Sequence, residues 1–142
     1  MVSHSRSRRH WLLALVVTAL FPVAASAGSI GWRTDYGEAR REASRSGRPV
    51  VVAVSTRGCP WCRQLERTTF RDSRVVGLIN RRSIPLKVDA NDPAHESLIK
   101  ALRLQGVPTM AVIMPDGRIV ANQSGYLDAP QFLSWVRPVL GE

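Results

Sequence analysis

The feature that most constrains the fold is a continuous β-branched run, "RPVVVAVST" (48–56), which both cysteines of the chain follow closely. An apolar run without polar alternation is typical of a strand buried on both faces of a sheet. Pro60 suits the first position of a helix, so a helix is expected to begin at Cys59. The pair Cys59 and Cys62 is therefore expected where a buried strand ends and a helix begins. In open α/β sheets, functional groups gather at that edge.

Helical and extended patterns alternate along the chain. The expected elements, in order, are a helix (35–47), the strand (48–56), one long or two consecutive helices from the cysteine pair to Arg82, a strand (83–90), a helix (92–106), two strands joined by a turn at "PDG" (108–126) and a helix (128–140). Asp35 is expected to cap the first helix and Gly47 to end it. Within the stretch 92–106, Gly106 should come just after the last helical residue, and Pro138 should end the last helix.

This order predicts the α/β class. Strands that alternate with helices form a parallel sheet covered on both faces, and a closing hairpin adds an antiparallel edge. We therefore expect one domain with a central mixed sheet of about four to five strands and helices on both faces.

The first 27 residues have the pattern of a secretory signal peptide, so the domain is assigned to 28–142. Three arginines precede an apolar run, and "ASA" (25–27) supplies small residues for cleavage after Ala27. An uncleaved anchor is the alternative, but the run is interrupted and shorter than the roughly 20 residues of a spanning helix. Export by the general secretory route to the periplasm is expected, and a twin-arginine signal is a looser match.

The formal net charge is +9, and it falls to +6 without the three arginines of the signal. The basic residues are scattered, which favours a solvated basic surface over a nucleic-acid site. An exported protein rarely meets nucleic acid, so that partner is not expected. An acidic partner or an anionic membrane surface is compatible with the charge.

Three interpretations of the cysteine pair compete. As a staple it would close a very short loop and contribute only about 2 kcal/mol, against about 4 to 5 for a long loop. A structural zinc needs four ligands, and beyond the signal the chain has two thiols and one imidazole, His95. The third interpretation is thiol–disulfide exchange, which we favour, with no metal or other cofactor. We expect His95 at the surface, without a catalytic role.

Exchange requires an accessible thiolate. A helix N-terminus stabilises a thiolate and lowers the pKa of a cysteine there, which fits Cys59 followed by Pro60. Arg57 and Arg63 flank the pair and act in the same direction. We predict Cys59 as the exposed nucleophile and Cys62, one turn further on, as the buried resolving thiol.

The chain resembles the thioredoxin superfamily in a series of motifs. These are "PVVVAVS", "CPWC", "LKVD" (86–89), "GVPT" (106–109), "MPDGRIV" (114–120) and a final helix that carries aromatic residues. CxxC alone is a moderate signal, and "GVPT" about 45 residues later makes it strong. The run "CPWCRQLERTTFRDSRVVGLINRRSIPLKVDAND" is most similar to exported domains related to the C-terminal domain of the Dsb-type membrane electron transporter.

The resemblance implies that Pro108 is cis, lies against the cysteines and exposes the backbone of Val107 to a substrate strand. A trans proline at the start of an edge strand is the alternative. Trp61 is expected to lie partly exposed beside the sulfurs and to contact substrate, and packing in the core is its alternative.

Departures from the family patterns at four positions leave the direction of electron flow open. Thioredoxins have a buried Asp six residues before the first cysteine, where this chain has Ala53, and the Lys paired with it maps to Pro85. Gly58 replaces the usual Trp, and the oxidising Dsb-type proteins usually carry His inside the motif, where this chain has Trp61.

The sequence thus predicts a monomeric periplasmic protein thiol–disulfide oxidoreductase, with the reductase or exchange direction slightly favoured. Its expected partners are exported proteins with thiols or disulfides and a membrane electron-transfer partner. The alternative is a non-catalytic adaptor that uses the same fold to bind a protein.

Overall fold

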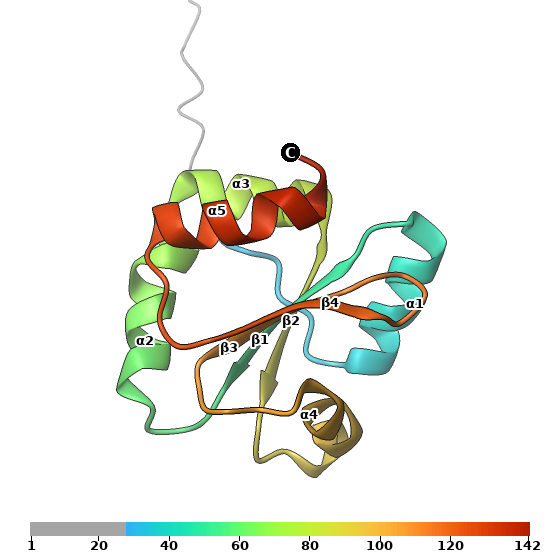
Figure 1. The fold of residues 1–142 in the computed structure, drawn as a ribbon, viewed down its shortest axis with the longest axis horizontal. Helices are drawn as coiled ribbons and strands as arrows, with labels where there is room; N and C mark the ends of the chain where they lie inside the picture. Colours follow the sequence, from blue (N-terminus) through green and yellow to red (C-terminus); the bar gives the residue numbers. More distant parts are fainter. Residues whose placement is uncertain (1–27) are drawn as a thin grey trace, which may run out of the picture.

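A four-stranded sheet forms the centre of the computed structural model, which describes residues 28–142 (Figure 1). The strands lie in the order β2-β1-β3-β4. The elements, in chain order, are α1 (Tyr36–Ser46), β1 (Val50–Ser55), α2 (Pro60–Arg67), the 3-10 helix η1 (Thr69–Arg71), α3 (Ser73–Arg82), β2 (Ile84–Asp89), the 3-10 helix η2 (Pro93–His95), α4 (Glu96–Leu102), β3 (Thr109–Ile113), β4 (Ile119–Ser124) and α5 (Ala129–Leu140).

The sheet is mixed, as predicted. β1 pairs with β2 in parallel, β3 runs antiparallel to β1, and β4 closes the antiparallel hairpin with β3. Ahead of α1, the backbone of Arg33 bonds to the free edge of β2: its N–H donates to Pro85 at 2.8 Å and its carbonyl accepts from Lys87 at 2.9 Å. The N-terminal segment is thereby fixed along that edge.

The central strand is buried on both faces, as its β-branched sequence predicts. Val51 and Ala53 pack in one core, which α2, α3 and α5 cover, and the alternate residues of β1 pack in a second core under α1 and α4. Figure 1 shows α3 and α5 on one side of the sheet and α4 on the other. The predicted α/β class with helices on both faces is confirmed.

The predicted caps of the first helix are confirmed. The Asp35 carboxylate accepts the Glu38 N–H at 2.6 Å, and Gly47 ends α1 with a left-handed backbone, φ 71°. Downstream of the cysteines the chain forms separate helices rather than one. Asp72 caps α3 by accepting the N–H groups of Arg74 and Val75, which starts a new helix after η1.

Two predicted helix ends are wrong. α4 ends at Leu102 rather than near Gly106, because Arg103 adopts the left-handed conformation with φ 48°. α5 continues through Pro138 to Leu140. Proline leaves the carbonyl of Ser134 without its helical partner, but Ser134 is exposed and water can bind there. Leu140 is buried, so packing retains the last turn.

The surface position predicted for His95 is also wrong. The residue belongs to η2 and is only 7% exposed. Its Nε2 lies 2.9 Å from the carbonyl oxygen of Thr34, so the ring bridges two segments of the chain. A 3-10 turn, instead of the helical face that the sequence suggested, directs the imidazole inward.

The predicted signal peptide (1–27) lies outside the described residues. Within residues 28–142, none of the helices combines the length and the apolar character that crossing a bilayer requires.

Candidate active site

The sheet topology brings the cysteine pair and Pro108 together. β1 ends at Ser55, four residues before Cys59, and β3 begins at Thr109, directly after Pro108. Because these strands are antiparallel and Val54 is opposite Thr109, the end of one lies beside the start of the other. Residues almost 50 positions apart therefore meet at one edge of the sheet.

The two cysteines form a disulfide at the start of α2, with their Cα atoms 5.3 Å apart. Cys59 is the N-cap residue and Pro60 takes the first helical position, as predicted. The backbone N–H of Cys62 donates to Cys59 Sγ at 3.1 Å. A dipole aimed at this sulfur stabilises negative charge on it when the pair is reduced. Gly58 has φ 83°, a backbone that favours glycine, and turns the chain into the helix.

The burial of the two sulfur-bearing residues differs. Cys62 is 5% exposed and packs in the interior, whereas Cys59 is half-buried. A partner can reach Cys59 more readily than Cys62. This asymmetry is the one required of a nucleophile and a resolving thiol.

The Val107–Pro108 bond is cis, which confirms what the family resemblance implied. Cys59 Sγ lies 3.9 Å from the carbonyl oxygen of Val107. The buried Thr109 hydroxyl holds this loop by contacting the Gly106 carbonyl at 2.6 Å and the Ser124 hydroxyl at 2.8 Å. The loop beside the nucleophilic sulfur is therefore fixed by side-chain as well as strand hydrogen bonds.

Trp61 lies on the surface, 61% exposed, so its alternative as a packed core residue is wrong. It lines an open hollow of about 360 Å³ together with Val107, Pro108, Gly125 and Tyr126. The rings of Trp61 and Tyr126 are 5.7 Å apart, and the Tyr126 hydroxyl lies 3.0 Å from that of Thr68. Sequence reasoning missed Tyr126, which follows β4 and reaches the site only through the fold.

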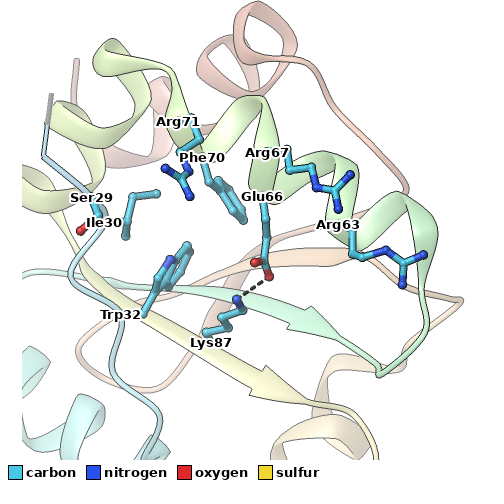
Figure 2. Close-up of a pocket in the computed structure, with 9 residues that line it drawn as sticks. All are labelled: Ser29, Ile30, Trp32, Arg63, Glu66, Arg67, Phe70, Arg71 and Lys87. Atoms are coloured by element: carbon cyan, nitrogen blue, oxygen red, sulfur yellow. Dashed lines mark ion pairs between the residues drawn. The ribbon is translucent and has the colours of Figure 1, made fainter.

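Arg57 and Arg63 are both exposed and do not line this hollow. Arg57 lies in the turn between β1 and α2, two residues before Cys59. Arg63 lies on α2 at the edge of a separate cavity on the flank of the helix, and its side chain extends away from Trp32 and Phe70 (Figure 2). Their influence on the pKa of the reduced Cys59 stays a prediction, as do the substrate-binding roles of Trp61, Val107 and Pro108.

A charged pair that the sequence analysis did not identify lies close to Cys62. Ala53 occupies the strand position where thioredoxins have Asp, and the residue in register with it on β2 is Lys87. The Lys87 ammonium forms an ion pair with the Glu66 carboxylate of α2 (Figure 2). A narrow space lined by Ala53, Cys62, Glu66 and Lys87 joins them. An acid is thus present near the resolving sulfur, supplied by a helix instead of the central strand.

Over residues 28–142, no group of three or more His, Cys, Asp or Glu side chains is placed to hold a metal ion.

A family model described as a thioredoxin-like domain matches residues 36–140, which include every element from α1 to α5. The chain belongs to the thioredoxin-like domain family. Its predicted class, a thioredoxin-like thiol–disulfide oxidoreductase with a Cys-x-x-Cys pair, is confirmed.

This thioredoxin-like chain is similar in sequence to DsbD and to a thioredoxin of known structure. The thiol:disulfide interchange protein DsbD of Yersinia pestis (strain Pestoides F) is 32% identical over 94 residues, 64% of this chain and 16% of that protein. The solved thioredoxin from Thermus thermophilus is 28% identical with a TM-score of 0.72, over 80% of this chain and 89% of that one. The chain thus spans about a sixth of the length of the curated relatives it matches.

The C-terminal domain of DsbD from Neisseria meningitidis, in its oxidised form, has the same fold. Its TM-score is 0.63 at 23% identity, and the match covers 72% of this chain and 90% of that domain. The predicted similarity of the thioredoxin-like chain to this domain is confirmed.

Proposed function

We propose that this thioredoxin-like protein is a periplasmic protein thiol–disulfide oxidoreductase that works mainly as a reductase or exchange catalyst. The observation that carries the proposal is the asymmetry at the start of α2. The half-buried Cys59 sulfur accepts the Cys62 N–H at 3.1 Å and lies 3.9 Å from the Val107 carbonyl, while Cys62 is buried behind it. The exposed ring of Trp61 offers a flat apolar surface to a protein partner.

In the reducing direction the Cys59 thiolate attacks one sulfur of a substrate disulfide. A mixed disulfide forms, and the other substrate sulfur leaves as a thiolate and takes up a proton. The Cys62 thiol then loses its proton, and its sulfur attacks Cys59 Sγ. The bond to the substrate breaks and the second substrate thiol is released, so two electrons and two protons reach the substrate and Cys59–Cys62 becomes oxidised.

The cycle requires a dithiol that reduces the pair again, and we propose a membrane electron-transfer partner for this step. The similarity to DsbD over 64% of this chain supports that assignment and favours the reducing direction. Residues 1–27 as a cleaved signal peptide support the periplasm as the location. The domain then comprises residues 28–142 and acts as a monomer on exported proteins with thiols or disulfides.

A test of the chemistry is insulin reduction with dithiothreitol as the electron source. The protein should accelerate insulin precipitation well above the rate with dithiothreitol alone, and Cys59→Ser should abolish the acceleration. Cys62→Ser should accumulate mixed disulfides with exported proteins that reductant releases. The adaptor alternative predicts a different result. The intact protein would not accelerate insulin precipitation, and both serine variants would bind partners equally well in the presence of reductant.

Direction and location need separate measurements. Equilibration with glutathione buffers measures the reduction potential of the Cys59–Cys62 pair. We expect a value closer to that of thioredoxin, about −270 mV, than to that of DsbA, about −120 mV. A value near the latter would reverse the assigned direction. Mass measurement of the protein recovered from the periplasm should show cleavage after Ala27, and a full-length membrane-bound chain would contradict the signal assignment.

A further inference from the structure

A second cavity, distinct from the hollow beside Trp61, lies on the flank of α2 (Figure 2). Its volume is about 500 Å³, in the range of sites that bind small ligands or peptide side chains. One wall is the N-terminal segment at Ser29, Ile30 and Trp32, and the opposite wall is α2 with η1. Lys87 of β2 lies at the base.

The walls carry an excess of positive charge. The cavity is lined by three arginines of α2 and η1, namely Arg63, Arg67 and Arg71. The one carboxylate among its lining residues, that of Glu66, is already paired with Lys87. Among residues 28–142, no carboxylate lies within ion-pair distance of these three guanidinium groups. All three arginines are exposed, so their donors are available to an anionic ligand.

The cavity also offers an apolar surface between its cations. Trp32 and Phe70 pack edge to face with ring centroids 5.1 Å apart, and Ile30 adjoins them. In Figure 2 the Arg71 side chain extends beside Phe70 into the space above Trp32. A ligand that fits this lining combines negative groups with an apolar side chain.

The cavity is built on fixed elements. The segment that carries Trp32 continues into Arg33, whose two backbone hydrogen bonds join it to β2. The Arg33 guanidinium binds both carboxylate oxygens of Glu42, at 2.9 and 2.6 Å, which ties the segment to α1. The fold thus fixes both walls of the cavity in place, so the cavity is formed before a ligand binds.

The cavity adjoins the redox pair. Glu66, Phe70 and Lys87 also line the narrow space that reaches Cys62. Arg63 follows Cys62 directly in the sequence. The Arg63 N–H donates to the Cys59 carbonyl at 3.2 Å, so Arg63 lies one turn of α2 beyond Cys59. A partner chain joined to Cys59 through its sulfur and running along α2 reaches this cavity at Arg63.

We infer that this cavity binds an extended acidic segment of the redox partner, next to the cysteine that the partner exchanges. The inference rests on the proposed function and names the chemistry of the partner. Arg63 and Arg67 are one helical turn apart, about 6 Å along the axis. Alternate residues of an extended chain are about 6.6 Å apart, so carboxylates at every second position match the arginines. An apolar residue of the segment packs on Trp32 and Phe70.

The binding test uses a fluorescently labelled, cysteine-free peptide with Asp or Glu at alternate positions and one Leu. Its partner peptide has Asn and Gln in place of the acids. Anisotropy titrations with the oxidised protein should show binding of the acidic peptide at least about tenfold tighter, and the difference should shrink at high salt.

Variants locate the site. The double variant Arg67→Glu/Arg71→Glu should weaken binding of the acidic peptide about tenfold or more. Arg41→Glu/Arg45→Glu is the matched control, because both arginines are exposed, lie on α1 outside this cavity and give the same change of net charge. It should weaken binding less than about twofold, through long-range charge alone.

Three outcomes would overturn the inference. These are equal binding of the acidic and amide peptides, equal loss in the two double variants, and binding of free citrate as tight as that of the peptide. The last outcome would make the cavity a small-anion site.

A kinetic measurement tests the effect of this cavity on turnover independently of the binding titrations. With peptide disulfides, an acidic flank should raise kcat/KM in the intact protein but not in Arg67→Glu/Arg71→Glu. Loss of insulin reduction with retained peptide binding would contradict the proposed function alone, whereas normal insulin reduction without acidic preference would contradict the inference alone.

Discussion

At the scale of single residues, Trp61 is the side chain whose position says most about substrate contact. Its ring is 61% exposed and borders the hollow formed with Val107 and Pro108. Large aromatic residues at the surface are often the anchors of protein interfaces. Because the ring contributes little to the core, its removal should affect binding more than folding.

We therefore expect Trp61→Ala to lower kcat/KM for a protein disulfide about tenfold. The free energy of unfolding should change by less than about 0.5 kcal/mol, measured by denaturant titration. The control substrate is a small aromatic disulfide, which does not need an extended contact surface and should react at nearly the wild-type rate. An equal loss with the small disulfide would assign Trp61 to the chemistry of the sulfurs instead.

Glu66 provides a second prediction at this scale. It lines the narrow space at Cys62 and pairs with Lys87, so its carboxylate can accept the proton that the resolving thiol gives up. Glu66→Gln should lengthen the lifetime of the mixed disulfide about tenfold or more, measured by rapid acid quench. Alkylation of Cys59 in the reduced protein should be unchanged.

Glu96→Gln is the matched control, since Glu96 forms an exposed ion pair with Lys100 on α4, outside the space beside Cys62. An equal effect of the two variants on the mixed disulfide would contradict a local role for Glu66.

At the scale of elements, the start of α3 determines how the chain leaves the active-site helix. Asp72 accepts the N–H groups of Arg74 and Val75 and also binds the Arg74 guanidinium at 2.7 Å. The hydrogen bond from Arg74 lowers the pKa of Asp72 from 3.8 to about 2, with the backbone hydrogen bonds acting in the same direction. The carboxylate is thus favoured in the folded state.

Asp72→Ala should reduce the free energy of unfolding at pH 7 by about 1 kcal/mol, the usual contribution of an N-cap side chain. Because the folded pKa is depressed, this contribution is present above pH 3.8 and is lost as the pH falls through about 2. Urea titrations of both proteins across this range should converge toward pH 2. A difference that persists there would show that the carboxylate charge is not the cause.

At the scale of the whole molecule, the two cores make unequal use of aromatic residues. The core under α2, α3 and α5 contains Phe132, which is fully buried. Its ring centroid lies 5.8 Å from that of Phe70 and 5.7 Å from that of Trp135. This side chain therefore links α5 to η1 and, through Phe70, to the cavity wall.

Phe132→Ala should lower the free energy of unfolding by about 3–5 kcal/mol, because a fully buried ring is removed and the cavity relaxes only in part. That loss is a large share of the free energy of unfolding of a typical domain, which is about 5–15 kcal/mol. Phe132→Leu, which keeps most of the volume, should cost less than about 1.5 kcal/mol. If denaturant titrations show that Phe132→Ala also lowers the free energy of unfolding by less than about 1.5 kcal/mol, the surrounding core collapses freely around the smaller side chain.

Much of the architecture follows from local signals. The β-branched run fixes β1 as a strand buried on both faces, and Asp35 and Gly47 set the bounds of α1. The cysteine pair at a helix start is likewise a local pattern, so its position after β1 could be predicted. Hydrophobic periodicity and capping act over a few residues, which is why the sequence reveals them.

The remaining features required the tertiary structure. Tyr126 lies beside Trp61, and Lys87 lines the space at Cys62, only because the sheet places β4 next to β3 and β2 next to β1. His95 is buried because η2 turns it toward Thr34, and α5 passes Pro138 because Leu140 packs in the core. These outcomes depend on contacts between distant segments, and such contacts are set by packing and register, which no short stretch of sequence encodes.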